Sequence, residues 1–143
     1  MSMNLNQILE RANESKFMTI ATIGLHGGAQ AVTVGFATHG DTIVFSSSVD
    51  SRKYANIQND GRVALVIMPD HHTSIDIEGS AAVLADGYEL TQAKDDYLAK
   101  NPEVSKRADS PDVAFFAVTI DWARCTDVSV SPWKIDTYEG GAE

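Results

Sequence analysis

The sequence predicts a small, mainly β fold in which six or seven antiparallel strands close into a barrel with flanking helices. Short runs of β-branched and aromatic residues alternate with glycine-containing turns, which is the pattern of strands joined by hairpins. Only three segments have the apolar spacing of amphipathic helices. A closed sheet also leaves no strand edge exposed, so these observations favour a barrel over an open sheet.

The predicted strands are apolar segments bounded by turn residues. In chain order they are residues 17–23, 30–38, 42–47, 62–68, 74–84, 113–121 and 124–130. Gly27-Gly28 and Gly40-Asp41 predict tight turns between the first three strands. Gly79 lies in the middle of the fifth strand, and we expect a bend or bulge there.

The predicted helices are amphipathic segments of moderate length, residues 4–12, 51–59 and 87–100. Asn4 is expected to cap the first helix, and Asp50 or Ser51 the second. Gly61 is expected to end the second helix in a left-handed conformation.

The length of 143 residues predicts a single domain, residues 1–143, with an N-terminal helical segment in 1–14 and a flexible tail in 139–143. The chain has 20 acidic and 11 basic residues, a net charge of −9. Nucleic acids and anionic membranes both attract basic surfaces, so neither is an expected partner. Cys125 is the single cysteine and is expected to be a small buried residue. With no apparent signal peptide or membrane span, we expect a cytoplasmic protein.

The segment 43–53 carries the strongest candidate site. A strand ends in a serine run that includes Ser46 and Ser47, and a helix follows with Arg52 and Lys53 in its first turn. Helix N-termini normally favour acidic residues, because the helix dipole is positive there. Two interpretations are open: the two bases are solvated surface charges, or they bind a phosphate together with the serine hydroxyls.

Several motifs along the chain occur in a characteristic order. They are residues 17–22, 31–36, 43–47, 51–57, 61–65 and 77–81. This order resembles the FMN-binding split barrel of the pyridoxamine 5′-phosphate oxidase-like family, and its short general-stress or unassigned members above all. The resemblance covers half to two-thirds of the chain and implies a homodimer that holds FMN at its interface.

The resemblance implies a phosphate end of the cofactor site. Arg52 and Lys53 would hold the FMN phosphate, Ser47 would donate its hydroxyl, and Ser46 would lie beside the ribityl chain. A polar strand exit is the alternative interpretation of the two serines.

The resemblance also implies a ring end of the site. The backbone of Thr33 and Val34 would follow the edge of the isoalloxazine. Ser74 stands where the oxidases carry a glutamine that contacts the ring. Trp133 stands where a C-terminal aromatic reaches the flavin across the dimer interface, with plain core or interface packing as the alternative.

Two departures from the family pattern shape the expected activity. Ala31 and Phe36 stand where the oxidases have an arginine and a lysine that help bind the cofactor. The basic C-terminal residues for the substrate phosphate are also not evident, so pyridoxal phosphate synthesis is not expected.

The expected function is therefore an FMN-dependent oxidoreductase acting on a small organic substrate, with no catalytic side chain and no metal ligand assigned. The alternatives are a non-catalytic flavin-binding stress or redox-sensing protein, a related F420- or haem-binding barrel, and a barrel that has lost its ligand.

Overall fold

A computed structural model describes residues 3–140 and confirms the mainly β fold. Its strands are β1 (Phe17–Ile23), β2 (Ala29–Gly35), β3 (Ala37–His39), β4 (Thr42–Ser48), β5 (Arg62–Asp70), β6 (Thr73–Val83), β7 (Val113–Asp127) and β8 (Lys134–Glu139). Its helices are α1 (Leu5–Ala12), α2 (Arg52–Asn59), α3 (Tyr88–Lys100), the 3-10 turn η1 (Pro102–Val104) and α4 (Ser105–Ala108).

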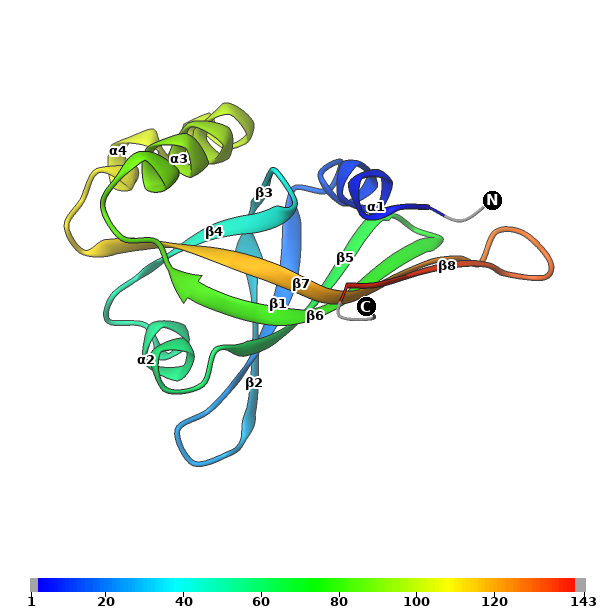
Figure 1. Ribbon diagram of the computed structural model, residues 1–143, viewed down its shortest axis with the longest axis horizontal. Coiled ribbons are helices and arrows are strands. Elements are labelled where there is room, and N and C mark those ends of the chain that lie inside the picture. Colours follow the sequence, from blue (N-terminus) through cyan, green and yellow to red (C-terminus); the bar gives the residue numbers. More distant parts are fainter. Residues whose placement is uncertain (1–2, 141–143) are drawn as a thin grey trace.

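The eight strands form one antiparallel sheet that curls into a split barrel (Figure 1). The strand order is β2-β1-β5-β6-β7-β4-β3, and β8 pairs with β7 outside this path. Asn4 caps α1, as predicted, and the structure shows that it forms a capping box with Gln7. Of the two candidates at the start of α2, Ser51 is the cap, because its side chain accepts a hydrogen bond from the backbone of Tyr54.

The barrel is split next to the bend between β2 and β3. The predicted single strand 30–38 divides at Phe36, which is fully buried. β2 pairs with β1 before this bend, and β3 pairs with β4 after it. β3 pairs only with residues Thr42 to Val44 of β4. Within the described residues, the second half of β4 therefore has a strand partner, β7, on one side only. An opening between β2 and β4 results.

The C-terminal strands differ from the prediction. The predicted strands 113–121 and 124–130 join into one strand, β7, which ends at Asp127, so residues 128–130 lie outside it. Its pairing with β6 continues through Trp122, with a bulge between Glu78 and Gly79. β8 was not predicted, and it includes Glu139, which was assigned to the flexible tail. Residues 141–143 of that tail lie outside the described residues.

Gly61 does not end α2 in the predicted left-handed conformation. Asp60, the C-cap, is extended with φ −150°, and Gly61 has no positive φ. Instead, the Gly61 carbonyl accepts a hydrogen bond from the Ala81 N–H at 2.8 Å, and a Cβ at Gly61 would lie 2.8 Å from the Ala81 carbonyl oxygen. Close contact between two backbones, and not a helix exit, therefore requires this glycine.

The core has two parts. The larger part fills the barrel, where the rings of Phe45 and Phe116 stack with centroids 4.8 Å apart. The smaller part lies under α3 and includes Tyr97 and Phe115. Cys125 is buried on β7 as predicted, and burial raises the pKa of its thiol. Within residues 3–140, no helix combines the length and apolar character of a membrane span.

Candidate functional site

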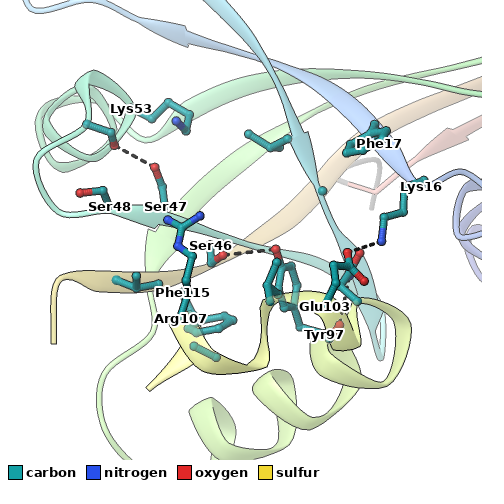
Figure 2. Close-up of a pocket in the computed structure, with 17 residues that line it drawn as sticks. Lys16, Phe17, Ser46, Ser47, Ser48, Lys53, Tyr97, Glu103, Arg107 and Phe115 are labelled. Atoms are coloured by element: carbon teal, nitrogen blue, oxygen red, sulfur yellow. Dashed lines mark hydrogen bonds and ion pairs between the residues drawn. The ribbon is translucent and has the colours of Figure 1, made fainter. Parts of the chain in front are cut away.

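A cleft of about 420 Å³ occupies the opening between β2 and β4 (Figure 2). Its base is formed by the serine run of β4, and one wall is formed by the start of α2. The opposite wall consists of α3, η1 and α4, and the rim is formed by Phe17, Val34 and Gly35. The volume lies within the range of about 300–1,000 Å³ that is usual for small-molecule sites.

A chain of hydroxyls joins β4 to α2. The Ser47 and Ser51 hydroxyl oxygens lie 2.8 Å apart, and Ser51 accepts from the Tyr54 N–H at 3.2 Å. Ser47 is buried, yet it lines the cleft. These contacts hold the first turn of α2 against the end of β4. The serine hydroxyls and Lys53 of α2 therefore line the same cleft.

Lys53 lines this part of the cleft from the first turn of α2. Its side chain is partly buried, and burial lowers the pKa of its ammonium group. Among the residues that the structure describes, no carboxylate lies within ion-pair distance of it. A partly desolvated cation without a counter-charge is stabilised by an anion, so this position suits a phosphate.

The structure separates Arg52 from Lys53. Arg52 is exposed and lines an adjacent depression of about 130 Å³, whose other residues include Gln30, Ala31 and Val32. Lys53 lines both spaces. The two bases that are adjacent in the sequence therefore do not both border the main cleft.

The opposite wall contains residues that sequence reasoning did not assign to a site. The Tyr97 hydroxyl accepts a hydrogen bond from Ser46 Oγ at 3.2 Å, and its ring packs edge-on against Phe115. Asn101 is buried and donates from Nδ2 to the carbonyl oxygens of Phe36 (3.2 Å) and Tyr97 (3.0 Å). These contacts attach α3 to the strand bend beside the cleft. In the sequence, Tyr97 lies in the segment 87–100, whose pattern predicts an amphipathic helix and no site.

Charged contacts hold the same wall in place. His39 at the end of β3 contacts Asp96 through Nδ1 at 2.7 Å and Glu89 through Nε2 at 2.8 Å, both on α3. These hydrogen bonds raise the pKa of His39. At the rim of the cleft, Lys16 forms an ion pair with Glu103 of η1.

The remaining predicted residues lie apart. Val34, Ser46, Ser47 and Lys53 come together in the cleft, but Thr33, Ser74 and Trp133 do not line it. The Thr33 side chain is exposed on β2, and Ser74 donates a hydrogen bond to Asp76 on β6. Trp133 is 62% exposed and is the last residue of the loop between β7 and β8, which projects from the barrel (Figure 1). Within one chain, the cleft contains half of the predicted set.

The donor set of the cleft fits a flavin mononucleotide. One end offers an ammonium group and serine hydroxyls, which are the donors that a phosphate monoester accepts from. The rim offers the apolar surfaces of Phe17 and Val34, against which an aromatic ring can pack. The polar base and the apolar rim therefore correspond to the phosphate and the ring of FMN.

The fold and this cleft define a split-barrel protein with a candidate site for a small molecule. Residues 5–127 match the pyridoxamine 5′-phosphate oxidase family, and the chain belongs to this family. A search of curated protein sequences gave no match.

Solved structures support the fold. A haem-binding protein from Mycobacterium smegmatis superposes with a TM-score of 0.81 and 19% identity, covering 94% of this chain and 58% of that chain. A pyridoxamine 5′-phosphate oxidase-related, FMN-binding protein from Nostoc punctiforme has a TM-score of 0.72 and 12% identity, covering 94% and 88%. A haem storage protein from Vibrio cholerae has a TM-score of 0.70 and 17% identity, covering 82% and 91%. At these identities, the likeness is one of fold.

Proposed function

We propose that the protein binds FMN in the cleft between β2 and β4 and acts as a flavin-dependent oxidoreductase on a small organic substrate. The observation that carries this proposal is Lys53, a partly buried cation without a carboxylate partner among the described residues, beside the serine hydroxyls of β4 and α2. The family match and the FMN-binding relative from Nostoc punctiforme support the choice of ligand.

Each part of the cleft has a role in this proposal. Lys53 and Ser47 bind the phosphate, while Ser46 lies beside the ribityl chain. Val34 and Phe17 contact the ring from the rim, and the wall of α3 to α4 limits the access of water. Bound FMN supplies two-electron redox chemistry, and this chain contributes binding, orientation and access control.

A homodimer belongs to the same proposal. The outer face of the sheet exposes apolar side chains next to the cleft, namely Phe17 (54% exposed), Val66 (43%) and Met68 (54%). Thr19 of β1 and Val66 of β5 are direct cross-strand partners, so this surface continues across both strands. Contiguous apolar surface of this kind marks protein interfaces. A partner on this face brings Thr33 and a second Phe17 into the interface.

The residues that line the cleft suit haem less well than FMN. Two of the similar structures belong to haem-binding or haem-storage proteins. Haem iron takes an axial ligand such as histidine, cysteine or methionine. None of the described residues that line this cleft is of these types. The Tyr97 hydroxyl, another type of axial ligand, is already hydrogen-bonded to Ser46.

The test is a titration of the purified protein with FMN, F420 and haem, followed by visible absorbance and by quenching of flavin fluorescence. The proposal predicts FMN binding that Lys53→Gln weakens, whereas Lys106→Gln, an exposed lysine outside the cleft, leaves it unchanged. Haem binding without FMN binding contradicts the proposal. Oxidation of NAD(P)H by the FMN-loaded protein distinguishes an oxidoreductase from a flavin carrier.

A further inference from the structure

Two cations without a carboxylate partner line the same cleft from opposite walls. Lys53 belongs to α2 and Arg107 belongs to α4, which are more than fifty residues apart in the sequence. Within residues 3–140, the Arg107 guanidinium forms no ion pair and no hydrogen bond. Figure 2 shows its side chain extending from the α4 wall toward Ser46 and Ser47.

The charges of the cleft differ from those of the whole chain. The described lining residues include three bases, Lys16, Lys53 and Arg107, and one acid, Glu103. Glu103 is paired with Lys16, so the positive charge of the other two is not neutralised. The chain as a whole has a net charge of −9. A local positive site in an acidic protein selects an anion at short range, because salt screens the overall repulsion within about 8–10 Å.

Arg107 occupies a position that Arg52 does not. Arg52 was expected to hold the phosphate, but its side chain borders the adjacent depression and not the main cleft. Arg107 borders the main cleft, beside the serine run of β4. A guanidinium donates two parallel hydrogen bonds to a phosphate, which an ammonium group cannot do.

We propose that Arg107 and Lys53 form a two-sided clamp for one phosphate monoester, which the serine hydroxyls of β4 complete. If the proposed function holds, this phosphate is that of FMN, and Arg107 is a further cofactor-binding residue. The clamp joins α4 to α2 across the cleft through the ligand. Ligand binding therefore orders the α4 wall, and the clamp gives FMN an advantage over unphosphorylated riboflavin.

The test compares Arg107→Gln with Lys106→Gln, which removes the same charge from the same helix but outside the cleft. Dissociation constants for FMN and riboflavin are measured by flavin fluorescence. We expect Arg107→Gln to weaken FMN binding about ten- to a hundredfold, which is the loss expected for a charge-assisted contact. Arg107→Gln should change the dissociation constant of riboflavin by no more than about twofold, as expected for a surface residue that does not contact the ligand. An unchanged FMN affinity, or an equal loss for both flavins, overturns the clamp.

A second measurement separates the clamp from the proposed function. The thermal midpoint of the flavin-free protein is recorded with inorganic phosphate, and with chloride at equal ionic strength. A ligand that binds the folded state raises this midpoint. Should no flavin bind the wild type, the proposed function fails. The clamp then stands if phosphate stabilises the wild type and Lys106→Gln more than Arg107→Gln, with another phosphate monoester as its ligand. If phosphate stabilises the wild type, Lys106→Gln and Arg107→Gln equally, the clamp is overturned.

Discussion

Asn56 connects α2 to the barrel, and Asn56→Ala is predicted to loosen the helix that carries Lys53. Its side chain is 3% exposed, and Nδ2 donates to Thr22 Oγ1 at 2.9 Å and to Gln30 Oε1 at 2.8 Å. The substitution deletes both bonds and leaves the buried Thr22 hydroxyl, 4% exposed, without this partner.

The size of the effect follows from these contacts. The lost bond to Gln30 contributes about 1 kcal/mol, and the buried Thr22 hydroxyl left unsatisfied costs about 1–3 kcal/mol, so the free energy of unfolding should fall by about 2–4 kcal/mol. For 143 residues, an unfolding entropy of about 2.1 cal/mol/K per residue converts this into a Tm lower by about 7–13 °C.

The assay is thermal unfolding followed by circular dichroism, with Asn59→Ala as the matched control. Asn59 lies on the same helix, is exposed, and makes no side-chain hydrogen bond within the described part of the chain. Its replacement should change stability by less than about 0.5 kcal/mol. The reasoning is refuted if the two variants unfold at the same temperature.

Three further predictions concern the fold and the dimer. The hydrogen bonds to Asp96 and Glu89 raise the pKa of His39 in the folded state. The stabilisation of the fold by protonated His39 is therefore complete below the unfolded-state pKa of about 6.5 and is lost as the pH rises through the folded-state pKa. The Tm difference between wild type and His39→Gln should therefore be largest in mildly acidic buffer and shrink as the pH rises; a constant difference contradicts this. Gly79→Ala should prevent stable folding, because its Cβ would lie 2.1 Å from the Thr119 carbonyl oxygen. Gly28→Ala, with nothing within 4 Å, should be tolerated, and far-ultraviolet circular dichroism of both variants checks this. Met68→Glu should convert the proposed homodimer into a monomer in size-exclusion chromatography; an unchanged elution volume places the interface elsewhere.

Local patterns predicted most of the fold. The first hairpin followed from two apolar runs around Gly27-Gly28, because both the turn and the strands are local features. β8 was missed because Ile135 and most of its other side chains are exposed, so the strand has no apolar alternation and exists through its pairing with β7. The single strand β7 was divided in two because Asp121 and Arg124 interrupt its apolar run.

The candidate site was predictable on one side only. Ser47 and Lys53 are close in the sequence, so a strand end followed by a helix start was enough to place them together. Tyr97 and Arg107 belong to a distant segment, and only the packing of α3 against Phe115 and the strand bend brings them to the cleft. Tertiary contacts of this kind leave no short-range pattern in a single sequence.

A crystal structure of the protein grown with FMN tests the central claim most directly. We predict one flavin in the cleft between β2 and β4, with its phosphate in contact with Lys53 and Ser47 and its ring beside Val34. A flavin phosphate bound away from Lys53, or density for FMN only outside this cleft, would contradict the account.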